Sequence, residues 1–135
     1  MIKMDKRGQI SVEFVLIIAF MFLLVALFGF YAADSNEKNV VSSAARSGVM
    51  DAASNLLLNN TITQPIRVNE ITTNENGKNV TLFINVSGSI STSTNQTLVS
   101  SALQSIVAQG YSLNITNSSD PFISTSKHNY RVIIV

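Results

Sequence analysis

Twenty consecutive residues near the start of the chain, from Phe14 to Ala33, contain no charged side chain and are mostly apolar. A helix of this length rises about 30 Å, which matches the thickness of the hydrocarbon core of a bilayer. Three cations, Lys3, Lys6 and Arg7, precede the block, and such cations favour the cytoplasmic side of a membrane. The pattern therefore predicts a membrane-spanning helix whose N-terminus lies inside the cell.

After Asp34 the apolar residues narrow to one stripe with the spacing of a helix. The stripe recurs at steps of three and four residues, at Val41, Ala45, Val49, Ala52 and Leu56. Helix-ending residues follow, at Asn59, Asn60, Thr61 and Pro65. The two patterns together predict one helix from about Ile10 to Leu58, roughly 75 Å long. Gly29 and Gly48 would each weaken it by about 1 kcal/mol relative to alanine, or else allow another helix to approach closely.

The rest of the chain reads as a small α+β head. Residues 66–73 and 79–86 favour strands, and the run 74–78 between them has the composition of a hairpin turn. Helical spacing then appears at Leu98, Ala102, Leu103, Ile106 and Val107, with Gly110 as the stop. Residues 111–116 and 130–135 read as two more strands, separated by a turn at 117–121. The expected order is a long helix, two strands, a short helix and two strands, with the apolar C-terminal strand inside the sheet.

Composition excludes several classes of function. The 135 residues suffice for one small domain and one membrane segment, and the absence of cysteine excludes disulfides and thiolate metal sites. Charged residues make up 13% of the chain, and the net charge is only +1. Nucleic-acid binding needs clustered cations on one face, so no nucleic-acid partner is expected.

No set of residues indicates catalysis, a metal or a cofactor. The single histidine, His128, lies in a polar run that reads as an exposed turn, and it has no second histidine to complete a metal site. No Ser-His-acid set and no glycine-rich phosphate loop is visible. We therefore expect a protein that is not an enzyme, with no catalytic, metal-binding or cofactor-binding residues.

A short motif joins the N-terminal cations to the apolar block. It reads Gly8-Gln9-Ile10-Ser11-Val12-Glu13-Phe14. This run resembles the N-terminus of archaeal type IV pilins with a class III signal peptide, in which glutamine-x-serine-x-glutamate-phenylalanine directly follows the cleavage site. The resemblance covers about the first thirty residues, and no family motif is apparent in the remainder.

The resemblance implies a cut between Gly8 and Gln9 by a prepilin peptidase, with Ser11, Glu13 and Phe14 serving recognition and assembly. The chain would then divide into a leader (1–8), a long helix (9–60, with 14–33 as membrane span and later filament core) and a head (61–135). The leader contains three cations and one acid, so the mature chain would have a net charge of −1. Glu13 would pair with the new amine of Gln9, or with hydrogen-bond donors if Gln9 cyclises to pyroglutamate.

The implied function is that of a structural subunit of an archaeal type IV pilus-like surface filament, serving adhesion. The subunit would enter the membrane as a prepilin and then form a homo-oligomeric filament on the cell surface. The implied partners are the peptidase, an assembly ATPase and a membrane platform. Two alternatives remain for the apolar block, namely an ordinary secretory signal peptide and the plain anchor of a monomeric extracellular binding domain. The anchor explains the cations but not Glu13.

The chain from Asn59 onward is also rich in Asn-x-Ser/Thr sequons, which are acceptors for N-glycans and favour surface positions. They occur at Asn59, Asn79, Asn85, Asn95, Asn114 and Asn117. If Val80, Leu82, Ile84 and Val86 face the core, the alternation of a strand directs Asn79 and Asn85 outward.

Overall fold

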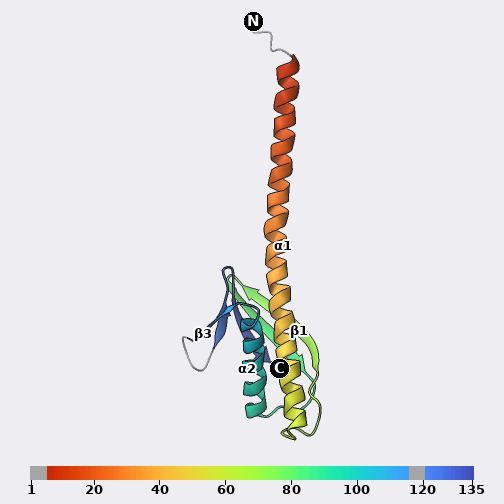
Figure 1. Ribbon diagram of the computed structural model, residues 1–135, viewed down its shortest axis with the longest axis vertical. Helices are drawn as coiled ribbons and strands as arrows, with labels where there is room; N and C mark the ends of the chain where they lie inside the picture. Colours follow the sequence, from red (N-terminus) through yellow and green to blue (C-terminus); the bar gives the residue numbers. More distant parts are fainter. Residues whose placement is uncertain (1–5, 116–120) are drawn as a thin grey trace. The chain divides into compact units, whose positions relative to one another are not determined.

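The computed structural model describes residues 6–115 and 121–135 of the chain. Its elements are two helices and five strands: α1 (Lys6–Leu58), β1 (Val68–Asn76), β2 (Asn79–Val86), α2 (Thr92–Val107), β3 (Ser112–Asn114), β4 (Phe122–Ser124) and β5 (Asn129–Ile134) (Figure 1). The chain divides into two compact units, residues 1–37 and residues 38–135. The first described part of α1 belongs to the first unit, and the head belongs to the second.

The head is built on a mixed five-stranded sheet with the order β1-β2-β5-β4-β3. The central strands β2 and β5 run parallel, and the other neighbours are antiparallel. The expectations of an α+β layout and of a C-terminal strand inside the sheet are confirmed, since β5 lies between β2 and β4. The expected strand order was incomplete, because three strands follow α2. The missed strand, β4, has only three residues, too few for a periodic signal.

The first hairpin is tighter than its sequence suggested. The polar run Asn74-Glu75-Asn76 belongs to β1, and the ladder continues until Asn76 lies opposite Asn79. The turn therefore contains only Gly77 and Lys78. Gly77 has a φ of 61°, a left-handed conformation that glycine adopts at no steric cost. The predicted strand 66–73 was thus placed too early, because hairpin pairing with β2 overrides the weak strand propensity of asparagine and glutamate.

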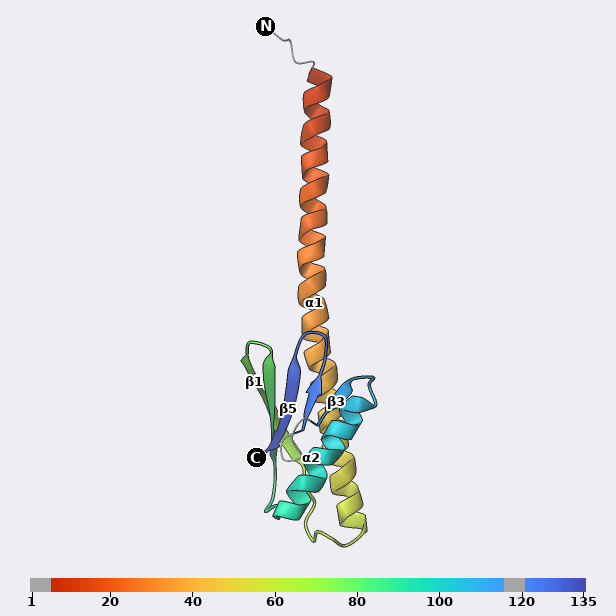
Figure 2. The ribbon, with the colours of Figure 1, turned by 90° about the vertical axis from the view of Figure 1, so that its left-hand side faces the viewer.

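One face of the sheet packs against both helices, which lie on the same side of it (Figures 1 and 2). The predicted stripe on α1 is confirmed, since Val41, Ala45, Val49 and Ala52 are buried and only Leu56, at its end, is partly exposed. β2, α2 and β5 contribute most of the remaining core, with Leu82, Ile84, Leu98, Ile106 and Tyr130 fully buried, and Ile66, Val68 of β1 and Ile123 of β4 complete it. Every buried apolar residue of this cluster lies between Val41 and Ile134, so the second unit has a complete core of its own.

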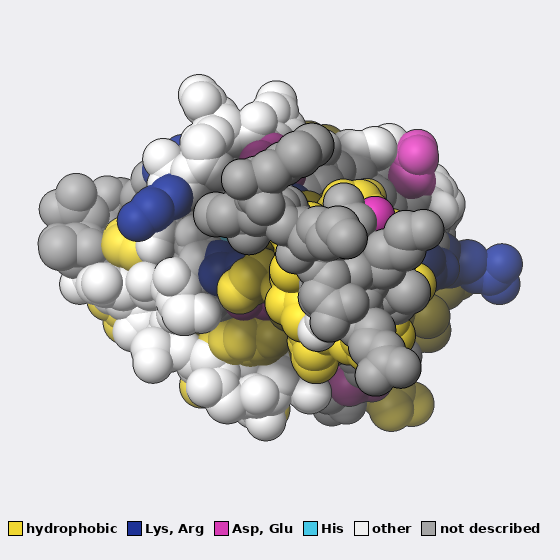
Figure 3. Space-filling view, turned by 90° about the horizontal axis from the view of Figure 1, so that it is seen from above, with side chains coloured by type: hydrophobic (Ala, Val, Ile, Leu, Met, Phe, Trp, Pro, Cys, Tyr) yellow, Lys and Arg dark blue, Asp and Glu magenta, His cyan; other side chains and the backbone are white. Residues whose placement is uncertain are grey.

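Neither of the two helices among the described residues lies on the opposite side of the sheet, and we call that side the helix-free face. Residues that lie opposite one another in a ladder share a face. The helix-free face consists of the alternate residues of β2 and their neighbours in β5: Asn79, Thr81, Phe83, Asn85, Asn129, Arg131 and Ile133. Its side chains are exposed or half-buried. In the view of Figure 3, the charged side chains of the described residues are few and are scattered among neutral ones.

Gly48 marks the place where α1 and α2 touch. A Cβ atom at this position would lie 2.9 Å from the Cα of Ala102 and closer still to the carbonyl oxygen of Ser101. Close approach between these helices therefore requires glycine at position 48. Gly29 differs, because a Cβ there would meet nothing within 4 Å. Of the two roles expected for these glycines, close helix approach applies to Gly48 in the head.

Candidate functional site: the N-terminal processing and assembly segment

The Gly8–Gln9 bond lies in the first turn of α1, because the helix begins at Lys6 and not near Ile10 as expected. The first four N–H groups of a helix have no partner within it, and helix ends fray readily. Glycine is also the weakest helix former after proline. The bond is therefore helical, but it lies at the end of α1, where local unwinding costs the least free energy.

The motif residues after this bond are solvent-exposed on α1. Ser11, Glu13 and Phe14 are all exposed, and Phe14 retains 62% of its accessible surface. Glu13 follows Gln9 by four residues, the spacing that brings side chains together on one side of a helix. The positive end of the helix dipole and a new α-amino group at Gln9 would both favour a carboxylate in this position. The geometry thus suits a charge pair at the start of a helix that begins at Gln9.

The apolar block that follows has no partner in the described chain. Leu24 is half-buried, and the other large side chains are exposed, namely those of Val12, Phe14, Val15, Leu16, Ile17, Ile18, Phe20, Met21, Phe22, Leu23, Val25, Leu27, Phe28, Phe30 and Tyr31. Fully burying one such side chain is worth about 1.5–3 kcal/mol, so leaving the whole set in water would cost tens of kcal/mol. By length and composition α1 is able to cross a membrane, and its most apolar window is 0% buried. Lipid or another apolar surface must therefore cover it.

The sequons occupy different structural settings. Asn59 is exposed just after α1, Asn79 and Asn85 are exposed in β2, and Asn114 is exposed in β3. Asn95 is half-buried in α2. Asn117 and residues 118–120 of the predicted turn lie outside the described residues. The prediction that Val80, Leu82, Ile84 and Val86 face the core and turn Asn79 and Asn85 outward is confirmed.

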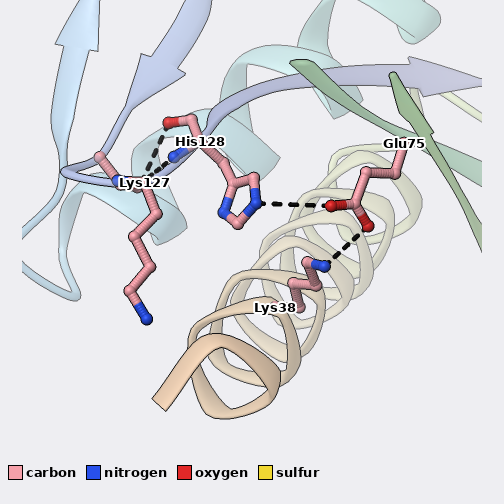
Figure 4. A network of polar contacts seen from close by, with 5 residues as sticks. Lys38, Glu75, Lys127 and His128 are labelled. Atoms are coloured by element: carbon pink, nitrogen blue, oxygen red, sulfur yellow. Dashed lines mark hydrogen bonds and ion pairs between the residues drawn. The ribbon is translucent and has the colours of Figure 1, made fainter. Parts of the chain in front are cut away.

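The expectation that His128 is an exposed turn residue was wrong. Its N–H donates to Thr125 Oγ1 at 2.9 Å, and this turn before β5 directs the ring inward against Tyr130. His128 retains only 9% of its accessible surface. Its Nε2 lies 3.5 Å from Oε1 of Glu75, and Oε2 of the same carboxylate accepts a hydrogen bond from Lys38 Nζ at 2.7 Å (Figure 4). We call Lys38, Glu75 and His128 the charge cluster.

The charge cluster connects three segments of the head, and the sequence analysis missed it. Lys38 lies on α1, Glu75 lies near the end of β1, and His128 precedes β5. Its members are far apart in the chain, so no local spacing reveals them. Within the described residues no group of three or more His, Cys, Asp or Glu side chains is placed to hold a metal ion. These contacts therefore suit a structural role, in which they hold the three segments together.

Comparison with known families addresses the N-terminal segment. Residues 6–31 match the family model of the class III signal peptide. The match covers the two cations at Lys6 and Arg7, the Gly8–Gln9 bond, the motif through Phe14 and most of the apolar block. No curated protein matches the chain. A class III signal peptide implies insertion in the membrane and processing by a prepilin peptidase and its assembly machinery. The N-terminal segment therefore supports a type IV pilin-like precursor.

Proposed function

We propose that the mature chain, from Gln9 to Val135, is the structural subunit of a type IV pilus-like filament on the cell surface. The observation that carries this proposal is the long run of mostly exposed apolar side chains directly after the signal-peptide motif. In the precursor, lipid covers these side chains. In the filament, the same helix from other subunits replaces the lipid, with residues 14–33 as the filament core and residues 61–135 as the outer head.

Glu13 favours the helix in the filament over the helix in the bilayer. Lipid tails are as apolar as leucine, so apolar contact alone gives a helix little reason to leave the bilayer for one register. A buried carboxylate costs several kcal/mol unless it is paired. A charge pair between Glu13 and the amine of Gln9, on the same or a neighbouring subunit, satisfies that carboxylate in the assembled core. If Gln9 has cyclised to pyroglutamate, hydrogen-bond donors near Ser11 take the place of the amine.

The proposal extends to partners and to the role of the filament. A membrane peptidase cuts the Gly8–Gln9 bond, and an assembly ATPase with its membrane platform extracts the cleaved subunit. The filament serves adhesion, and the pattern of the motif favours an archaeal source. Exposure of the head outside the cell also brings its sequons within reach of glycosylation.

The decisive experiment compares cells that express the wild-type chain with cells that lack it, using electron microscopy and the material sheared from the cell surface. The proposal predicts filaments only in the expressing cells, with this chain as their main protein. A second strain expresses a Leu23→Asp variant, which places a charge in the middle of the core and should abolish the filaments. A monomeric membrane-anchored binding domain, the rival function, predicts no filaments in any of these strains and the wild-type chain in the membrane fraction alone.

A further inference from the structure

The strand β2 presents both recognition residues of one sequon on the same face of the sheet. Side chains two apart in a strand point to the same side of the sheet. The two recognition residues of the sequon Asn79-Val80-Thr81 therefore both lie on the helix-free face, while Val80 between them is buried in the core. An enzyme that approaches this face meets the amide and the hydroxyl together.

The amide of Asn79 is also oriented for modification. Its Oδ1 accepts a hydrogen bond from Asn129 Nδ2 at 3.3 Å. This contact uses the oxygen of the amide and leaves the nitrogen, the atom to which a sugar is joined, on the other side. Thr81, Asn129, Phe122 and Arg131 line a hollow of about 280 Å³ beside Asn79. The hollow gives a bulky polar group space next to the strand.

The sequons at Asn95 and Asn85 are less well presented. Asn95 is half-buried in the first part of α2, and the hydroxyl of Thr97 in the same sequon donates to the carbonyl oxygen of Ser93 at 3.0 Å. This hydroxyl therefore points toward the backbone of the preceding turn of α2. Asn85 is exposed, but Oγ of Ser87 in its sequon accepts from the backbone N–H of Arg67 at 3.0 Å. In both sequons the hydroxyl is already engaged with the backbone.

We propose that Asn79 is an N-glycosylation site of the folded head, with Thr81 as its recognition hydroxyl, and that Asn95 is not modified. This inference rests on the proposed location of the head outside the cell. The transfer forms a bond between Nδ2 of Asn79 and the anomeric carbon of a sugar. It breaks the bond between that carbon and the phosphate of a lipid-linked sugar donor. The lipid phosphate leaves, and the amide nitrogen gives up one proton to a base of the transferase.

Modification of Asn79 determines which face of the head is exposed to solvent in the filament. A glycan at this position covers the helix-free face and prevents close contact between that face and a neighbouring subunit. The helix-free face is then the side that meets solvent in the filament, and contacts between heads use other surfaces.

The test is glycopeptide mass spectrometry on the full-length chain recovered from its own cells, with site occupancy measured for wild type and four variants. We expect glycan at Asn79 in wild type, loss of it in Asn79→Gln and Thr81→Ala, and retention in Thr81→Ser, which keeps the hydroxyl. The matched control, Asn95→Gln, should leave the total glycan mass unchanged. An unmodified Asn79 in wild type, or equal occupancy at Asn95, overturns the proposal.

Filaments counted in the same cultures separate this inference from the proposed function. Filaments with an unmodified Asn79 contradict the glycosylation site alone. Glycan on Asn79 in a strain without filaments contradicts the filament role and supports the site. The variant Thr81→Ser guards against misfolding, because it changes one methyl group and should restore the occupancy that Thr81→Ala removes.

Discussion

The ammonium nitrogen of Lys38 lies 2.7 Å from Oε2 of Glu75, a carboxylate 37 residues further along the chain. Lys38 is the first residue of the second compact unit, and Glu75 lies near the end of β1. The other oxygen of the same carboxylate faces His128. One carboxylate therefore contacts both the first residue of the second unit and the turn before β5.

Replacement of Glu75 by glutamine should weaken the head modestly. The side chain of Glu75 is 45% exposed, and ion pairs at such positions contribute about 0.2–1 kcal/mol. We expect Glu75→Gln to lower the free energy of unfolding by about 1 kcal/mol, with a smaller loss at high salt because salt screens exposed charges. Chemical denaturation of a fragment covering residues 34–135, which contains the complete core, provides the measurement.

The matched control for that experiment is Glu70→Gln in the same strand. Glu70 is exposed and lies opposite Asn85, on the helix-free face, so its replacement should change the free energy of unfolding by less than about 0.5 kcal/mol. Equal losses for the two variants would show that the charge cluster adds nothing specific.

Gly48→Ala should destabilise the head even though alanine favours helices. Alanine gains about 1 kcal/mol over glycine in an exposed helix. At Gly48, however, the added Cβ would meet the backbone of α2 at Ser101 and Ala102, and forced overpacking costs about 1–3 kcal/mol. Thermal unfolding of the fragment 34–135 should therefore show a lower melting temperature for Gly48→Ala. Ser47→Ala, an exposed neighbour on the same helix, should match wild type, and a rise in melting temperature for Gly48→Ala would refute the close contact.

The sequence predicts those parts of the fold in which apolar residues repeat with the spacing of a helix or a strand. The stripe from Val41 to Ala52 repeats with the period of a helix, and Val80 to Val86 alternate as in a strand, so both were correctly placed against the core. β4 depends on its pairing with β3 and β5, and the extension of β1 to Asn76 depends on its pairing with β2 across the turn at Gly77 and Lys78. The burial of His128 depends on Glu75 and Tyr130, which no nearby spacing reveals.

The candidate site divides in the same way. The spacing of Gly8, Gln9, Ser11 and Glu13 can be recognised in the sequence, because recognition by a peptidase and formation of a helix both depend on a short segment. The sequence does not reveal that Gly8–Gln9 lies in a helical turn, nor that Asn79 lies in a strand while Asn95 lies in a helix. These differences depend on backbone conformation, and they decide which groups an enzyme can reach.

Gly8→Val should block maturation. A β-branched side chain at this position prevents the close approach of a protease to the backbone and stiffens the turn that must unwind. We expect this variant to keep residues 1–8 and to remain in the membrane, as measured by intact mass of the membrane fraction. Gly29→Val is the control, because the surroundings of Gly29 are open and the site of cleavage is untouched. Normal removal of the leader from Gly8→Val would contradict the assigned cleavage site.

Glu13→Ala and Glu13→Leu should be inserted and cleaved, yet fail to assemble. Insertion depends on total hydrophobicity, which both variants increase. Loss of one partner of a buried pair typically costs about 3–5 kcal/mol, and even about 3 kcal/mol corresponds to a change of roughly 100-fold in an equilibrium. Filament yield, counted by electron microscopy, should fall by at least that order. The neighbouring change Val12→Leu should leave the yield intact, whereas normal filaments from Glu13→Ala would reduce Glu13 to a membrane-boundary residue.

The most direct measurement is the mass of the N-terminal peptide of this chain in filaments sheared from the cell surface and collected by sedimentation. A subunit of a type IV pilus-like filament should sediment with the filaments and begin at Gln9, as glutamine or as pyroglutamate, with residues 1–8 removed. A chain that still begins at Met1, or that begins near Asp34, and that is absent from sedimenting filaments would contradict the assignment.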